Sequence, residues 1–173
     1  MAKGFFVGVF VTLLAFAAGA FVFVKTGALP AGQDVKPGRL EKWAAKTSLR
    51  ATVRRESKSL KSPIEPSAEN LEAGVLLYQT HCQVCHGGSD GEASPIAKGL
   101  SPDAPQLAKH GVTDDPEGVI YWKVAHGIRF TGMPAFRSSL SEPELWQMTL
   151  FLKQMDDLPA GAKQRWGAAK AAP

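Results

Sequence analysis

The sequence predicts an all-α protein in which an apolar amino-terminal helix precedes one small helical domain. Three observations lead to this fold class. No stretch alternates apolar and polar residues as a half-buried strand would. Three later segments repeat apolar residues at helical spacing and begin with capping signals. Near the amino terminus, residues 4–24 form a run of 21 residues without a charged side chain.

The uncharged run predicts a transmembrane anchor over residues 1–25. About 20 apolar residues in a helix cross a bilayer core of about 30 Å. A cleaved signal peptide is the alternative, with Ala18-Gly19-Ala20 as its small-residue cleavage site. The apolar run continues past that site through Phe21–Val24, which favours an uncleaved anchor. Either interpretation exports the rest of the chain.

Residues 26–66 are predicted to form a basic linker, rich in Gly and Pro at both ends. Its middle, residues 39–61, has no Gly or Pro and permits a helix. Eight Lys and Arg face two Glu there, a net charge of +6. A thin apolar stripe would run along one side of that helix: Leu40, Trp43, Thr47 and Ala51. The segment is interpreted either as a solvated helix or coil, or as a strip against the membrane surface or a partner subunit.

Residues 67–158 are predicted to form the folded domain, beginning with a helix that Ser67 caps. Its apolar residues are Leu71, Val75 and Tyr78. A second helix is expected after Asp114 and Asp115 as caps, with Pro116 in its first turn and Gly127 at its end. The domain carries six basic and twelve acidic residues, a net charge of −6.

A third helix begins at Ser141, where Ser141-x-x-Glu144 matches a capping box. Its apolar face contains Leu145, Met148, Leu152 and Met155. Long loops rich in Gly and Pro separate the helices, and residues 159–173 are predicted to be a flexible tail. Three short helices give a thin core for about 90 residues, which indicates that the domain folds around a cofactor.

The only two cysteines stand in Cys82-Gln83-Val84-Cys85-His86. A spacing of three residues brings both thiols to one side of a helical turn, next to the imidazole of His86. This pattern is the attachment signal of a covalently bound c-type haem, with one thiol for each vinyl group and the histidine on the iron.

Three other interpretations of the motif were weighed against haem attachment. A redox-active dithiol is more often found after a strand, and no strand precedes this one. A zinc site needs four ligands, and without a second Cys pair it would have to use His81, His110 and His126. A disulfide across two intervening residues would add little stability.

Met133 is the predicted second axial ligand of the iron. It lies in a loop, 47 residues after His86, between Gly132 and Pro134. A Met outside a helix is poorly explained as core filler, which is how Met148 and Met155 are interpreted. His110 and His126 are the rival ligands. Ligation by His and Met raises the reduction potential.

These motifs together resemble a class I c-type cytochrome, over about 90 of the 173 residues. Gly74-x-x-x-Tyr78 before the cysteines resembles the first helix of that family, and Gly132-Met133-Pro134 resembles its axial methionine loop. The resemblance implies a fold of three to five short helices around one haem, whose first and last helices cross near Gly74 and Trp146. It also implies that the carbonyl of Pro105 accepts a hydrogen bond from His86, with the carbonyl of Pro102 as the alternative acceptor.

The resemblance implies a one-electron carrier rather than an enzyme. Two axial ligands leave no position for a small-molecule substrate at the iron. The expected partners are redox proteins, either met by a swinging tethered domain or joined with it in a fixed respiratory or dehydrogenase complex. A haem-based sensor or enzyme with a dissociable methionine is the alternative.

The expected location is the bacterial cytoplasmic membrane, spanned once by residues 4–24, with the haem domain on the periplasmic or outer side. This orientation follows from where the family acquires its haem, since the basic linker runs against the positive-inside tendency. No nucleic-acid partner is expected, because the basic run lies outside the folded domain and contains one aromatic residue, Trp43.

Overall fold

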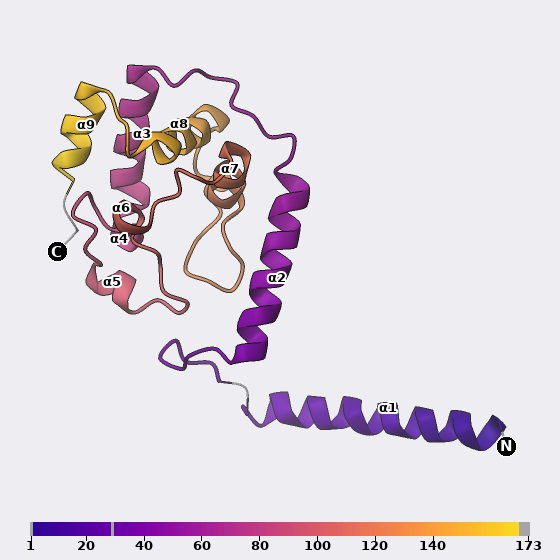
Figure 1. The fold of residues 1–173 in the computed structure, drawn as a ribbon. Helices are drawn as coiled ribbons and strands as arrows, with labels where there is room; N and C mark the ends of the chain where they lie inside the picture. The colour runs from indigo at the N-terminus through magenta and orange to yellow at the C-terminus, as the bar shows by residue number, and fades with distance from the viewer. Residues whose placement is uncertain (1, 29, 170–173) are drawn as a thin grey trace. The chain divides into compact units, whose positions relative to one another are not determined.

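The computed structural model describes residues 2–28 and 30–169, and every regular element within these ranges is a helix. The chain divides into two compact units, one ending at Val35 and the other beginning at Lys36. The first unit is built on α1, Ala2–Lys25, and the second holds the remaining elements (Figure 1). They are α2 (Arg39–Glu56), α3 (Ala68–His81), α4 (Gln83–His86), α5 (Pro95–Lys98), α6 (Leu107–His110), α7 (Glu117–His126), the 3₁₀ turn η1 (Phe136–Ser138), α8 (Glu142–Gln154) and α9 (Ala160–Gly167).

The first unit is formed by an apolar helix with exposed side chains. None of the 24 residues of α1 is buried. At about 1.5 Å per residue the helix is about 36 Å long, enough to cross a bilayer core. Its length and composition are consistent with the predicted anchor.

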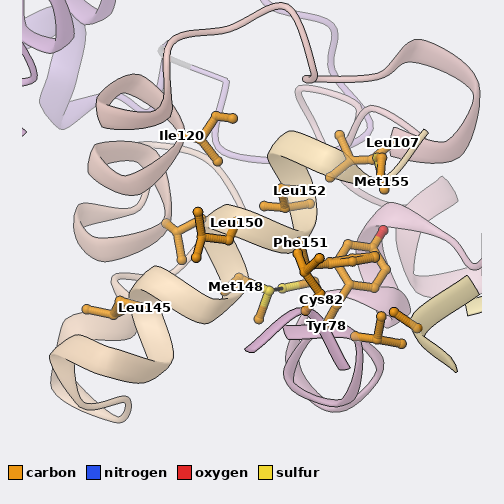
Figure 2. Packing of buried hydrophobic residues seen from close by; sticks show 14 of the residues in the cluster. Tyr78, Cys82, Leu107, Ile120, Leu145, Met148, Leu150, Phe151, Leu152 and Met155 are labelled. Carbon is orange, nitrogen blue, oxygen red and sulfur yellow. Dashed lines mark hydrogen bonds between the residues drawn. The ribbon is translucent and has the colours of Figure 1, made fainter. Parts of the chain in front are cut away.

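The core of the second unit is the crossing of α3 and α8. Figure 2 shows Tyr78 of α3 beside Phe151 and Met148 of α8, all three fully buried. The helices touch at Gly74, where an added Cβ would lie 2.6 Å from the Cβ of Phe151 and would also collide with the carbonyl oxygen of Gln147. The close approach expected at Gly74 is therefore made to these two residues rather than to Trp146.

The capping signals predicted the starts of two helices correctly. The hydroxyl of Ser67 accepts a hydrogen bond from the Asn70 amide at the start of α3, and Ser141 with Glu144 forms the capping box of α8. At α7 the prediction was wrong, because the N-cap is Pro116. Asp115 does not cap this helix, since its carboxylate pairs with the ammonium of Lys123 at 2.7 Å.

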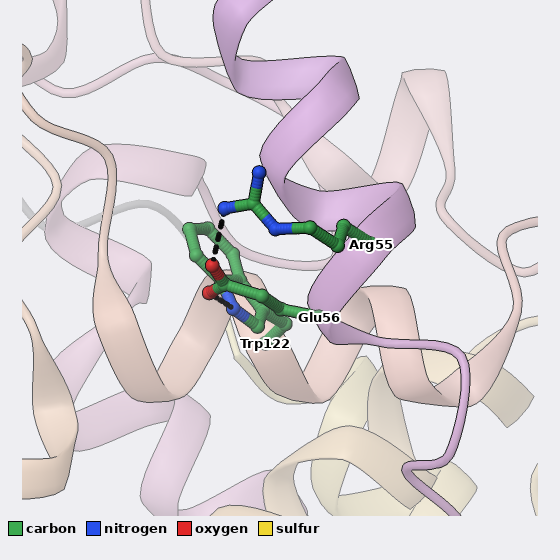
Figure 3. Close-up of polar contacts among 3 residues, drawn as sticks. All are labelled: Arg55, Glu56 and Trp122. Carbon is green, nitrogen blue, oxygen red and sulfur yellow. Dashed lines mark hydrogen bonds and ion pairs between the residues drawn. The ribbon is translucent and has the colours of Figure 1, made fainter.

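The basic segment predicted as a linker contains α2, whose last turns belong to the folded unit. Val53 is buried, and the indole of Trp122 on α7 donates a 3.0 Å hydrogen bond to Glu56 (Figure 3). Bonds from Arg55 and then Trp122 hold the pKa of Glu56 below its ordinary value. Beyond α2, a Cβ at Gly118 would lie 2.6 Å from the carbonyl oxygen of Ser57, so the chain leaving α2 is pressed against α7.

The packing of α2 shortens the connection between the two units. Leu49, Val53 and Ser57 recur every four residues on the side of α2 opposite Leu40, and they make the domain contact. Only thirteen residues, 26–38, separate α1 from α2. At about 3.5 Å per extended residue they span at most about 45 Å.

The carboxy-terminal segment was predicted as a flexible tail, but residues 160–167 form α9. Its Trp166 ring lies 5.3 Å from the rings of both Tyr78 and Phe151, and Ala162 is fully buried. The Ser89 amide also donates to the carbonyl oxygen of Ala169. The Ala- and Gly-rich composition of the segment gives no sign of these contacts. Residues 170–173 of the predicted tail lie outside the described residues.

Gly74→Ala should destabilise the folded unit by about 1–3 kcal/mol, because the added methyl group meets the backbone of α8. Gly167→Ala is the matched control, since an added Cβ there has no neighbour within 4 Å. Urea unfolding followed by circular dichroism measures both variants. Equal stabilities for the two would contradict the described helix crossing.

Candidate functional site

The cysteine motif consists of Cys82, which caps the end of α3, and the single helical turn α4 that follows it. Cys82 ends α3, and its carbonyl oxygen accepts hydrogen bonds from the amides of Cys85 and His86 at 3.0 and 2.8 Å. The turn brings both thiols and the imidazole to the wall of one cavity of about 310 Å³. The three residues that the sequence singled out therefore share one site.

Three side chains from separate segments hold the backbone of this turn. The hydroxyl of Tyr78 donates to the carbonyl oxygen of Gly87 at 2.9 Å. The side-chain amide of Gln106 donates to the carbonyl oxygen of Cys85 at 3.1 Å, and the hydroxyl of Ser94 donates to that of Val84. Because three side chains hold these carbonyl oxygens, the backbone that carries the motif side chains is rigid.

His86 is oriented by Pro105, the residue that the resemblance named. Its Nδ1 lies 2.8 Å from the carbonyl oxygen of Pro105, so the bond requires a proton on Nδ1. Burial lowers the pKa of His86, while the bond to Pro105 acts in the opposite direction. The ring is thus favoured in its neutral form with Nε2 unprotonated, which is the form that binds a metal.

Met133 reaches the same cavity from the loop after α7. Its amide donates a 3.1 Å hydrogen bond to the hydroxyl oxygen of Thr131, and its carbonyl oxygen accepts one from the amide of Ile128 at 3.2 Å. Gly127 begins the loop at φ +65°, where a Cβ would lie 2.5 Å from the carbonyl oxygen of Pro134. A glycine at this position lets the two ends of the loop close on each other.

The rest of the cavity wall is mostly apolar. Cys82 joins the cavity to the core, since its Sγ lies 3.9 Å from Sδ of Met148, as Figure 2 shows. Burial raises the pKa of the Cys82 thiol to about 12. The apolar side chains of the wall come from α2, α6, α7, α8 and the loops: Leu49, Leu100, Leu107, Val112, Ile120, Val124, Ile128, Phe136 and Leu152.

Two thiols, an oriented imidazole and a thioether around one apolar cavity fit a haem. Thiols three residues apart match covalent attachment, and nitrogen and thioether sulfur are ligands that haem iron takes in cytochromes. Within the described residues, no group of three or more His, Cys, Asp or Glu is placed to hold a metal ion by itself. The residues that are present thus match haem better than zinc.

The rival histidines lie elsewhere. His126 is exposed and stacks on Trp122 at 4.9 Å, and His110 is exposed at the end of α6. Neither lines the cavity, whereas His81, which the sequence offered only as a zinc helper, does. Met148 and Met155 are buried in the core, as predicted.

Sequence reasoning missed several residues of the site. Leu49 lines the cavity although it lies in the predicted linker, and its spacing of four from Val53 was the signal that could have found it. Ser94 and Gln106 hold the motif backbone from loops without a regular pattern. Nothing in the local sequence indicates that role.

Comparison with protein families gives one match. Residues 69–152 match the family model described as cytochrome c oxidase, cbb3-type, subunit III. The match begins within α3, ends within α8 and covers just under half of the chain. It includes the cysteine motif, Pro105 and Met133. No curated protein and no solved structure matches the chain.

Gly127→Ala should destabilise the protein more than Gly111→Ala, by about 1–3 kcal/mol. Both glycines have positive φ, +65° and +61°, so both substitutions carry the same backbone strain. Only at Gly127 would the methyl group also meet the carbonyls of Met133 and Pro134. Urea unfolding of the two variants measures the difference, and equal stabilities would contradict the described loop.

Proposed function

We propose that this protein is a membrane-tethered one-electron carrier with a single covalently attached haem c, on the basis of a c-type cytochrome domain at residues 69–152. The observation that carries the proposal is the convergence of Cys82, Cys85, His86 and Met133 on one apolar cavity. The bond between His86 and Pro105 adds to it, because it leaves Nε2 of the ring for the iron.

Each residue of the site has a chemical role in this proposal. The thiols of Cys82 and Cys85 each add across one vinyl group, so that the sulfur binds one vinyl carbon and the hydrogen goes to the other. No electrons are gained or lost in that addition. The imidazole of His86 and the thioether of Met133 would hold the iron, and the bond to Pro105 would increase the basicity of the His86 ring. The bound haem would supply a one-electron iron couple, which the thioether of Met133 shifts to higher potential.

The Met133 loop supports a carrier over a sensor or enzyme with a dissociable ligand. Hydrogen bonds to Thr131 and Ile128 fix the backbone of Met133 on both sides, and Pro134 restricts the exit of the loop. A ligand held in this way remains in place during a redox cycle. It leaves no coordination position for a substrate.

The family description and the short connection support a fixed subunit over a long-range shuttle. The matched model is named for an oxidase subunit. Because α2 packs on the domain, residues 26–38 alone connect it to α1, and their span of at most about 45 Å limits its travel. We therefore propose that the chain is a subunit of a respiratory electron-transfer complex. The alternative is that it carries electrons as a free, membrane-tethered protein.

The proposed location is the bacterial cytoplasmic membrane, with α1 spanning it and the haem domain on the periplasmic or outer side. The support for spanning is the length and exposure of α1. The support for orientation is the haem chemistry of the family. The acidic residues of the domain are suited to partners with basic docking faces.

The purified protein should keep one haem after denaturation in acid, as an added mass of one tetrapyrrole. Cys82→Ala and Cys85→Ala should each leave one thioether bond, and the double variant should release all haem on denaturation. Mass spectrometry of the denatured chains measures this. Haem-free protein from a strain that attaches haem to other c-type cytochromes would contradict the proposed function.

Met133→Leu should lower the reduction potential on the order of 100 mV or more, within the range of about 0.8 V that axial ligands cover. The substitution conserves volume and removes the sulfur. Met155→Leu is the matched control, because its thioether lies in the core and does not line the cavity. Redox titration monitored by visible absorption compares them. Unchanged potentials in both variants would exclude Met133 as a ligand.

A further inference from the structure

The outer side of α2 is an exposed surface that the proposed function leaves without a role. Leu40 and Trp43 are 76% and 65% exposed, although both are large apolar residues. Seven exposed cations lie on α2 and just beyond it, and we call them with Leu40 and Trp43 the α2 surface: Arg39, Lys42, Lys46, Arg50, Arg54, Lys58 and Lys61. Such a combination of aromatic and basic side chains is typical of helices at a bilayer surface.

The cations of the α2 surface have no carboxylate partner among the described residues. The ion pairs found there involve other bases, such as Arg55 with Glu56 and Lys123 with Asp115. Their positive charge is therefore available to an external anion. Together with Glu41 and Glu56, residues 39–61 have a net charge of +6.

Part of the α2 surface borders a groove of about 690 Å³ between α2 and the start of α7. Its basic residues from this surface are Arg50, Arg54, Lys58 and Lys61. The two carboxylates in the groove are already engaged, Asp115 by Lys123 and Glu117 by the amide of Ser62. The groove thus holds five cations, these four and Lys123, against two carboxylates.

Helical spacing arranges this surface on one side of α2. Trp43, Lys46, Arg50 and Arg54 are separated by three, four and four residues, so they follow one stripe along the helix. Leu49 and Val53 lie directly beside this stripe, three and seven residues after Lys46, and they line the same groove while they contact the domain. The stripe residues are nevertheless exposed beside this contact, so they can bind a partner while α2 stays packed on α7.

We propose that the α2 surface binds the anionic phospholipid surface of the membrane that α1 spans, and so fixes the orientation of the haem domain on it. The cations meet lipid phosphates, and Leu40 and Trp43 enter the headgroup region. This inference rests on the proposed function in one respect, the anchoring by α1.

Charge and chain length favour lipid over an acidic protein as the occupant. Residues 26–38 keep the start of α2 within about 45 Å of the end of α1, so the bilayer surface is always within reach. Anionic lipids attract each nearby Lys or Arg and repel the remainder of the domain, whose residues 67–158 have a net charge of −6. The negative potential of the lipid surface thus attracts the α2 surface and repels the acidic remainder of the domain.

The test uses the full haem-loaded chain in lipid nanodiscs, with an environment-sensitive fluorescent amino acid in place of Ala44, an exposed residue of α2. The nanodiscs contain phosphatidylcholine alone or with phosphatidylglycerol. We expect a blue-shifted emission and quenching by spin-labelled lipid only with phosphatidylglycerol, and reversal by high salt. The anchor holds the protein in every disc, so the signal reports α2 alone.

A triple variant tests the cations directly. Lys46→Gln, Arg50→Gln and Arg54→Gln together should lower the ratio of docked to undocked protein about 100-fold, at about five-fold for each cation near an anionic surface. The control removes the same charge from exposed positions elsewhere: Lys98→Gln, Arg137→Gln and Lys163→Gln. We expect this control to dock like the unmodified chain.

The outcomes separate the two proposals. The proposed membrane contact would be overturned if the emission were the same in both lipid compositions. It would also be overturned if the test variant and the control variant lost docking equally. Protection of position 44 by an added acidic protein but not by lipid would also overturn it. Haem content and redox spectra are recorded on the same samples, so loss of haem would contradict the proposed function without deciding the docking.

Discussion

The turn from Cys82 to His86 is the constraint on which the rest of the domain depends, because it belongs to the core and the cavity at once. Cys82 packs against Met148 on α8 while it also lines the cavity. One turn before it, Tyr78 contacts the rings of Phe151 and Trp166 and ties its hydroxyl to the end of the motif. A displacement of α3 against α8 or α9 would therefore move the thiols and the imidazole.

Different contacts hold the His86 side and the Met133 side of the cavity in place. The side of His86 rests on the core through α3 and on three side chains that bond the motif backbone. Met133 depends on hydrogen bonds within its own loop and on the closure of that loop at Gly127. In the proposed function both His86 and Met133 would hold the iron. This arrangement explains how a small helical core can organise long loops around a redox centre.

Because α2 packs on α7, the basic segment is a part of the domain rather than a spacer. The helix contributes Leu49 to the cavity wall and contacts α7, and its exposed cations and Trp43 lie beside that contact. Charge is thus separated within one folded unit, with basic residues on α2 and acidic residues over the rest. Such a separation can orient a domain in the field of a charged membrane.

The sequence by itself determined the fold class, the cysteine motif, the candidate ligand Met133 and the caps of α3 and α8, because these features depend on residues close together in the chain. Only the tertiary structure placed Leu49 and Trp166, since both act through contacts with residues far away in sequence. Composition suggested a linker and a tail at these positions, where the apolar residues of a charged helix and the half-buried ring of Trp166 make the contacts with the domain. Local pattern specifies helices and motifs, whereas long-range contacts decide which of them belong to the folded unit.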